Sequence, residues 1–183
     1  MLEALLLGLA LATFALPLPP TAQMLLGIFF FLLASPGLYG YLRGAPYVPT
    51  GRKIAKTMLA WAAVKRGERV YDLGCGDGRF VFAAAKLGAL ATGYELSVPA
   101  YAIAKIRSVF RKGADIRFRD FWKEDYRDAD VIFCFQTVTA MQRFKEIVWP
   151  QLKPGCRVVS HAFAMKGIEP KKSDGQALLY IKP

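Results

Sequence analysis

The chain has 183 residues, a formal net charge of +11 and a hydrophobic fraction of 54%. This length fits one globular domain with an appendage. The single histidine and the three cysteines, which lack metal-ligand spacing, support neither a zinc site nor a nucleophilic triad, and the cysteines are interpreted as buried cytosolic thiols.

The first part of the chain is strongly apolar. Residues 4–42 contain no Asp, Glu, Lys, Arg or His. The prolines within residues 17–20 interrupt any continuous helix, and residues 21–42 are long enough to cross a hydrocarbon core. Residues 2–16 are shorter than a comfortable span, so the segment forms either a helical hairpin or a single span with an interfacial piece.

Two other interpretations of this segment are less favourable. A cleaved signal peptide needs a positive first region, whereas the only early charge is Glu3. A buried pair of soluble helices needs a large apolar partner that the rest of the chain hardly offers. We therefore predict a membrane anchor at residues 1–44 and a globular domain at residues 45–183.

All 25 basic residues lie in or just before the predicted globular domain, from Arg43 onward. Because several of them directly follow the apolar segment, the positive-inside rule places the domain in the cytoplasm. The high positive charge of a domain beside a membrane predicts contact with anionic lipid headgroups. Nucleic acid is the other candidate partner, and we do not favour it because the Lys and Arg residues are scattered rather than gathered in a stripe.

Strands and helices alternate along the predicted domain. Thr50 is expected to cap a helix that runs to about residue 65. Strands are predicted at residues 68–73, 89–95, 115–119, 129–135, 156–163, 168–172 and 176–182. Helices are predicted at residues 78–87, 97–113 and 139–149, the second capped by Ser97. This alternation predicts a Rossmann-like α/β fold with a mostly parallel sheet, and the last two strands form an antiparallel hairpin.

The most informative motif follows the first strand of that sheet and reads Asp72-Leu73-Gly74-Cys75-Gly76-Asp77-Gly78-Arg79. Its glycines let a backbone turn approach a ligand at a helix N-terminus. Glu95 ends the next strand, where such folds bind a ribose diol. The third glycine comes one position too early for the dinucleotide pattern, and Asp72 repels a pyrophosphate but suits an ammonium group. The motif therefore predicts S-adenosyl-L-methionine as the ligand.

Further candidate residues follow the third and fourth strands of the domain. We expect Asp120 to accept a hydrogen bond from an adenine amino group and Phe121 to pack on the ring; an ordinary turn acid is the alternative for Asp120. Gln136 and Thr137 lie where a substrate amine would approach, with a satisfied amide at a helix start as the alternative for Gln136. His161 is interpreted as structural, with a pocket-lining role as the alternative.

These motifs resemble those of the seven-β-strand (class I) methyltransferases. More narrowly, with Tyr47-Val48-Pro49-Thr50 and the apolar N-terminus, the chain resembles the membrane-anchored protein-lysine methyltransferases. That family includes the mitochondrial enzymes for the ATP synthase c-subunit and the adenine nucleotide translocase. The resemblance implies S-adenosyl-L-methionine as cofactor and S-adenosyl-L-homocysteine as product. The cofactor-binding residues that we expect are Tyr47, Pro49, Thr50, Asp72, Gly74, Cys75, Gly76, Gly78, Glu95, Leu96, Asp120 and Phe121. The substrate-pocket candidates are Tyr47, Gln136 and Thr137.

The predicted function is therefore a membrane-anchored, S-adenosyl-L-methionine-dependent N-methyltransferase that acts on a lysine of a membrane or membrane-proximal protein. No catalytic residue is assigned, because methyl transfer from a sulfonium needs in-line positioning rather than a histidine or cysteine. Two alternatives stay open. One is a phospholipid N-methyltransferase with a headgroup amine as acceptor. The other is a catalytically idle membrane scaffold, which the intact glycine motif disfavours.

Overall fold

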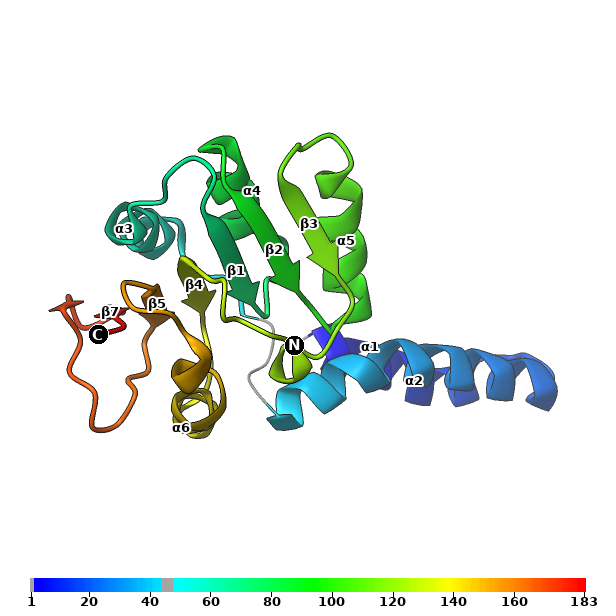
Figure 1. Ribbon diagram of the computed structural model, residues 1–183. Coiled ribbons are helices and arrows are strands. Elements are labelled where there is room, and N and C mark those ends of the chain that lie inside the picture. The colour runs from blue at the N-terminus through cyan, green and yellow to red at the C-terminus, as the bar shows by residue number, and fades with distance from the viewer. Residues whose placement is uncertain (1, 44–47) are drawn as a thin grey trace.

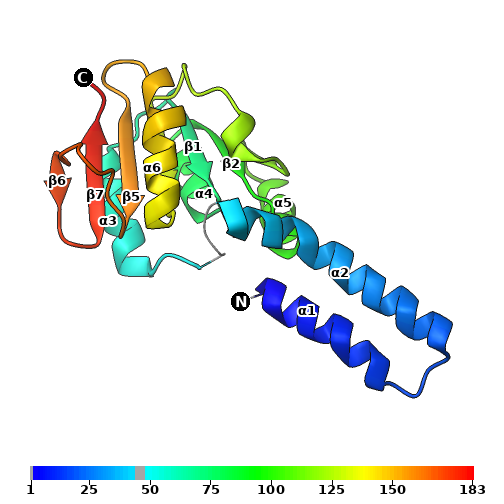
Figure 2. The same cartoon turned by 90° about the horizontal axis from the view of Figure 1, so that it is seen from below.

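The computed structural model describes residues 2–43 and 48–183, which form an α/β domain with a helical hairpin projecting from one side (Figures 1 and 2). Tyr47, a predicted site residue, lies outside the described residues, so its role stays a prediction.

The hairpin consists of α1 (Leu2–Ala12), a short 3-10 turn (Thr13–Ala15) and α2 (Pro20–Arg43), and α1 packs against α2. The interruption predicted at the prolines is confirmed, because the first helical unit ends before them and α2 begins at the last one. A Cβ at Gly27 of α2 would lie 3.3 Å from the Thr13 hydroxyl, so the two helices meet through small residues. The segment Pro20–Gly40 is long and apolar enough to cross a membrane. Only 6% of its most apolar window is buried.

The domain is built on one seven-stranded sheet with the order β3-β2-β1-β4-β5-β7-β6. The strands are β1 (Arg69–Leu73), β2 (Leu90–Tyr94), β3 (Ala114–Arg117), β4 (Val131–Cys134), β5 (Arg157–His161), β6 (Lys172–Ser173) and β7 (Ala177–Ile181). Strands β1 to β5 pair in parallel, and β7 pairs antiparallel with both β5 and β6. The predicted fold class and the terminal antiparallel pair are thus confirmed. The strand order reverses between β1 and β4, which is where α/β sheets bind ligands.

Helices cover both faces of the sheet (Figure 2). They are α3 (Arg52–Ala62), α4 (Arg79–Lys86), α5 (Val98–Ser108) and α6 (Val138–Ile147), with short 3-10 turns at Phe121–Lys123 and Trp149–Gln151. One buried cluster joins α3, α4 and α5 to the sheet through Met58, Val81 and Ala104. A second cluster joins α6 to the opposite face through Met141 and Phe144. The three cysteines are all buried and free, as predicted.

Several predicted helix ends were wrong. The N-cap of α3 is Gly51, and Thr50 is instead buried beside the cavity described below. Ser97 is the N-cap residue of α5, as predicted, but its hydroxyl makes no cap hydrogen bond. Pro99 removes one of the two N–H groups from which the hydroxyl could accept. Helix α5 ends at Ser108, five residues early. The Ser108 hydroxyl donates to the Lys105 carbonyl at 2.7 Å and so competes with the helical ladder.

Candidate functional site

The glycine-rich turn leaves β1 at the point where the strand order reverses. Gly74, Gly76 and Gly78 have φ values of +84°, +54° and +80°, which side chains with a Cβ rarely adopt. The backbone N–H groups of Gly74 and Cys75 both donate to the Tyr94 carbonyl, at 3.0 and 2.9 Å. The turn is therefore held against the end of β2 before it enters α4.

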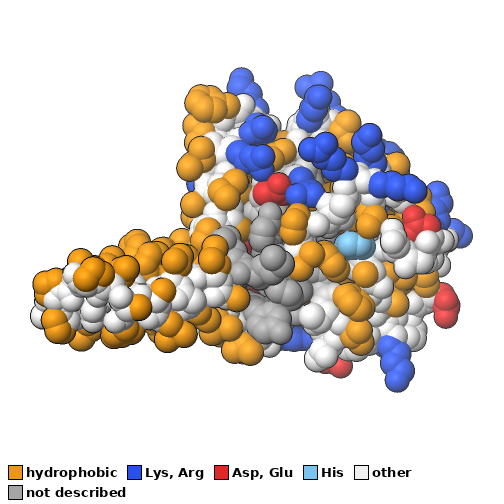
Figure 3. Space-filling view, turned by 180° about the vertical axis from the view of Figure 1, so that it is seen from behind, with side chains coloured by type: hydrophobic (Ala, Val, Ile, Leu, Met, Phe, Trp, Pro, Cys, Tyr) orange, Lys and Arg blue, Asp and Glu red, His pale blue; other side chains and the backbone are white. Residues whose placement is uncertain are grey.

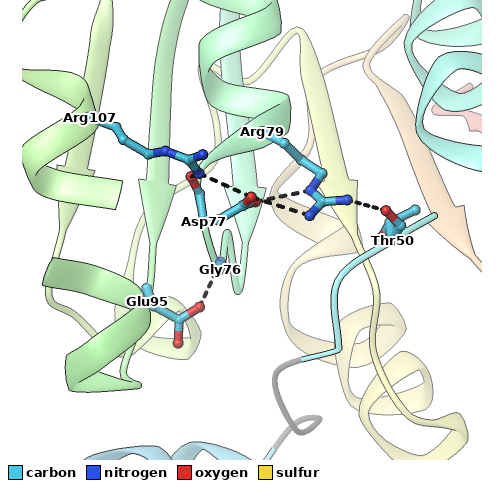
Figure 4. Close-up of polar contacts among 6 residues, drawn as sticks. All are labelled: Thr50, Gly76, Asp77, Arg79, Glu95 and Arg107. Carbon is cyan, nitrogen blue, oxygen red and sulfur yellow. Dashed lines mark hydrogen bonds and ion pairs between the residues drawn. The ribbon is translucent and has the colours of Figure 1, made fainter. Parts of the chain in front are cut away.

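Glu95 is fixed at the end of β2 by three backbone donors. Its Oε2 accepts from the Gly76 N–H at 2.7 Å, and its Oε1 accepts from Leu96 and Ser97 at 2.8 and 2.7 Å (Figure 4 shows the Gly76 bond). The side chain is 8% exposed. One carboxylate thus joins the glycine-rich turn to the segment that enters α5.

Asp72 presents a buried carboxylate to the same cavity. It is 4% exposed, and its Oδ2 has no hydrogen-bond partner within residues 2–43 and 48–183. Burial raises the pKa of Asp72 well above its usual value, and the neighbouring Glu95 and Asp77 raise it further, although Arg79 acts in the opposite direction. A cationic group in the cavity would supply the missing partner and relieve the cost of the charge.

An ion network supports the far side of the turn (Figure 4). Arg79 donates to both oxygens of Asp77, at 3.0 and 3.2 Å, and Arg107 of α5 donates to Asp77 at 3.2 Å. Arg79 also donates to the Thr50 carbonyl. Burial acts to raise the pKa of Asp77, but the bonds from Arg79 and Arg107 outweigh it, and the pKa lies below its usual value. The network ties Thr50, which was expected at the cofactor site, to the turn through a contact with Arg79 that the sequence did not reveal.

The C-terminal end of α2 forms one wall of the cavity through Gly37 and Gly40. A Cβ at Gly40 would lie 3.4 Å from the Leu96 Cβ, so this glycine allows the helix to approach the end of β2 closely. The Tyr39 hydroxyl, from the same turn of α2, donates to Asp120 Oδ2 at 3.4 Å. The sequence reasoning missed this wall. The only available signal was two small residues near the end of a segment of bulky apolar side chains.

Most of the predicted site residues meet at this cavity. Those that line it are Pro49, Thr50, Asp72, Gly74, Cys75, Gly76, Glu95, Leu96, Phe121 and Gln136. Three others lie beside it without lining it. Gly78 is the N-cap of α4, and the Thr137 hydroxyl caps α6 by accepting from the Ala140 N–H at 3.3 Å. Asp120 accepts from the Trp122 N–H at 3.1 Å, so its contact with an adenine stays a prediction.

Gln136, which lines the cavity, offers a fixed amide. It is 2% exposed, and its Nε2 donates to the Leu73 carbonyl at 2.8 Å. Its Oε1 is buried and has no partner in the part of the chain that the structure describes. His161 lies outside the cavity lining and packs on Phe135, with ring centroids 4.0 Å apart, and burial lowers the pKa of its imidazole. Within the described ranges, no group of His, Cys, Asp and Glu side chains forms a metal site.

Comparisons with known proteins agree on one family. Residues 72–172 match the model of the ANTKMT methyltransferase domain. A protein-lysine N-methyltransferase of Saccharolobus islandicus is 38% identical over 137 residues, which are 72% of this chain and 85% of that protein. The Mus musculus lysine N-methyltransferase of the ATP synthase c-subunit is 29% identical over 154 residues. These cover 81% of this chain and 62% of the mouse protein, so the chain spans less than two thirds of that relative.

A solved structure is also similar over most of the domain. It is the crystal structure of an RNA methyltransferase from Salinibacter ruber in complex with S-adenosyl-L-homocysteine. It is 30% identical, with a TM-score of 0.68, and the match covers 74% of this chain and 94% of that one.

Proposed function

Because the chain belongs to the ANTKMT methyltransferase domain family, we propose that this S-adenosyl-L-methionine-dependent methyltransferase methylates a lysine side chain of a membrane or membrane-proximal protein. The resemblance drawn from the motifs is thereby confirmed, as is the predicted cofactor. The lysine acceptor and the membrane location are proposals that rest on the cavity and on the hairpin.

The residues at the cavity fit this cofactor. The unpartnered Asp72 oxygen suits its ammonium group, and the fixed Glu95 carboxylate suits its ribose hydroxyls. The left-handed glycines leave the backbone bare of side chains where the ligand approaches. Phe121 offers an aromatic surface to the adenine. When bound, the cofactor supplies a methyl group already activated by its sulfonium, so the protein has to position the acceptor and exclude water.

The Gln136 amide is the observation that carries the acceptor proposal. Gln136 lines the cavity, and the hydrogen bond from its Nε2 to the Leu73 carbonyl fixes the orientation of the amide. Its buried Oε1, which has no partner among the described residues, can accept only from an N–H or O–H donor. A lysine amine is such a donor, and the hydrogen bond would orient the nitrogen lone pair. Burial favours the neutral amine over the ammonium form, whose solution pKa is about 10.4. The archaeal and mouse relatives, both named lysine N-methyltransferases, support the same acceptor.

The hairpin supports a membrane location. Its surface is formed by exposed apolar side chains, among them Leu25 at 65% and Leu32 at 61% exposure. On the face drawn in Figure 3 the coloured side chains of the hairpin are hydrophobic, whereas the Lys and Arg side chains lie over the domain. We propose residues 1–44 as the anchor and residues 45–183 as the methyltransferase domain. The basic residues after α2 support a cytoplasmic location for that domain.

Transfer of labelled methyl groups tests the acceptor. Membranes that lack the protein are incubated with the purified full chain and labelled cofactor, and are then separated into protein, lipid and nucleic-acid fractions. We expect label in protein, as methylated lysine. Label in lipid alone would establish the phospholipid alternative instead. Label in nucleic acid alone would place the chain with RNA methyltransferases such as the Salinibacter protein.

A substitution at Gln136 tests the proposed geometry in the same assay. Gln136→Leu removes the amide oxygen and is expected to lower label transfer about 5- to 150-fold, which corresponds to a lost hydrogen bond of about 1–3 kcal/mol. Cofactor affinity, measured by calorimetry, should stay near the wild-type value. Gln176→Leu, at an exposed position away from the cavity, is the matched control. Normal transfer by the Gln136 variant would contradict the proposed role.

A further inference from the structure

Helix α5 has an apolar outer face in addition to the face that it buries. Ala100 and Ala104 are buried at 2% and 0% exposure, and Ala104 packs in the cluster that joins α5 to the sheet. On the other side, two large apolar side chains of α5 and two in the turn that follows Ser108 form what we name the α5 stripe: Ile103, Ile106, Val109 and Phe110, which are 50%, 71%, 70% and 92% exposed. A contiguous apolar surface of this kind is rarely left in water and marks an interaction site.

Helix α5 lies on the side of the domain from which the hairpin projects (Figures 1 and 2). In Figures 1 and 2, α5 runs across the direction of α2, close to the end where α2 meets the domain. The two helices are in contact there. Figure 3 shows hydrophobic side chains both along the hairpin and on the adjoining edge of the domain. If α2 crosses a bilayer, α5 therefore lies parallel to the bilayer plane, with its long side against the bilayer surface.

Basic side chains flank the α5 stripe. Lys105 and Arg107 are about half exposed and pair with Asp115 and Asp77, at 3.8 and 3.2 Å. Arg111 and Lys112 follow at the exposed end of the helix, where the Arg111 guanidinium lies 4.5 Å from the Phe82 ring centroid. An apolar stripe bordered by Lys and Arg is typical of helices that lie in the interface of an anionic membrane.

We propose that the α5 stripe inserts into the surface of an anionic lipid bilayer, so that α2 anchors the enzyme and α5 fixes its orientation. This inference rests on the membrane location proposed above. The consequence concerns the acceptor. Ser97, at the N-cap of α5, donates to the Glu95 carboxylate, and Gly40 of α2 approaches Leu96, so both membrane elements meet at the cavity. Docking of α5 would hold the cavity at the membrane surface and restrict the acceptor to lysines within a short distance of it.

Nitroxide labels in the full chain test this arrangement. The three native cysteines are buried, so a cysteine introduced on the surface can be labelled selectively. Labels at Ile106→Cys and Phe110→Cys are compared in vesicles of phosphatidylcholine and phosphatidylglycerol with a control label at Ile181→Cys. Ile181 is 45% exposed in β7, near the opposite edge of the sheet. A further label at Leu25→Cys reports whether α2 enters the bilayer.

We expect the labels at positions 106 and 110 to be accessible to oxygen and shielded from a water-soluble relaxation agent, and the label at position 181 to show the reverse. If the label at position 25 lies in the bilayer but the labels at positions 106 and 110 are as accessible to the water-soluble agent as the label at position 181, the α5 proposal is wrong. The proposal that α2 is a membrane anchor is then still supported. If the label at position 25 is also in water, the proposed membrane location is wrong, and the α5 proposal that rests on it is wrong as well. Strong spin–spin broadening at position 110 would show a second copy on the stripe and would also overturn the proposal.

Discussion

Replacing Glu95 with glutamine perturbs the most constrained contact of the site. Glutamine keeps the shape, but its amide has one oxygen where the carboxylate has two. If that oxygen keeps the bonds from Leu96 and Ser97, the NH2 group faces the Gly76 N–H, which now bonds to Oε2 at 2.7 Å. A buried donor left without an acceptor costs about 1–3 kcal/mol. For a chain of this size each kcal/mol lowers the Tm by about 2–4 °C, so a fall of about 2–12 °C is expected.

The same substitution should weaken cofactor binding, because it removes the charge that strengthens a hydrogen bond to the ribose hydroxyls. Such a bond contributes about 1.5–3 kcal/mol, which corresponds to about a 10- to 150-fold increase in Kd. Calorimetry with S-adenosyl-L-homocysteine measures the Kd, and circular dichroism of the detergent-purified chain measures the Tm. Glu169→Gln, at an exposed position, is the control and should change neither. A lower Tm with a wild-type Kd would refute the binding role and leave Glu95 as a purely structural residue.

Two further predictions concern the walls of the cavity. Asp72→Asn should weaken cofactor binding and stabilise the ligand-free protein. The raised pKa of Asp72 means that wild-type stability falls as pH rises from the ordinary carboxyl range through that pKa. Chemical denaturation at several pH values should show this loss in the wild type and not in the variant. If the free energy of unfolding changes equally with pH in both proteins, the prediction is wrong. Gly40→Leu should raise the Kd for the cofactor about tenfold through overpacking against Leu96. Gly8→Leu is the control, because nothing lies within 4 Å of a Cβ at that position, and it should leave the Kd unchanged. If the Gly40 and Gly8 variants bind the cofactor equally well, α2 does not border the bound ligand.

The cofactor side of the site could be predicted because its determinants are local. A strand, a turn with glycines at left-handed positions and a helix follow one another within residues 68–87, and Glu95 lies at the end of the next strand. Parallel strands end at the same edge of a sheet, so the strand-end residues Asp72, Glu95 and Gln136 had to converge once the alternation of elements was recognised. The alternating pattern predicted the mostly parallel sheet, whereas the order of its strands was not predicted and comes from the structure.

The contacts that the sequence did not reveal join distant segments. Tyr39 and Asp120 are 81 residues apart, and Arg79 meets the Thr50 carbonyl 29 residues away. Hydrophobicity shows that α2 is apolar, but it does not show which of its turns meets the domain. The outer face of α5 was overlooked for a related reason. Its periodicity predicts a helix, and only the packing of Ala100 and Ala104 shows that the larger side chains point away from the core.

The geometry also links the two proposed membrane elements, α2 and α5, to the cavity. Glu95 joins the glycine-rich turn to Ser97 at the start of α5, and the adjacent Leu96 contacts α2 at Gly40. Displacement of either helix must therefore move a residue that borders the cavity. If the hairpin and the α5 stripe are both held by lipid, these two helices keep fixed positions, and the entropy of ordering the cavity wall is lost on attachment rather than on cofactor binding. We therefore expect a lower Kd for the cofactor in anionic vesicles than in detergent, and equal values would show that the membrane fixes only the location of the enzyme.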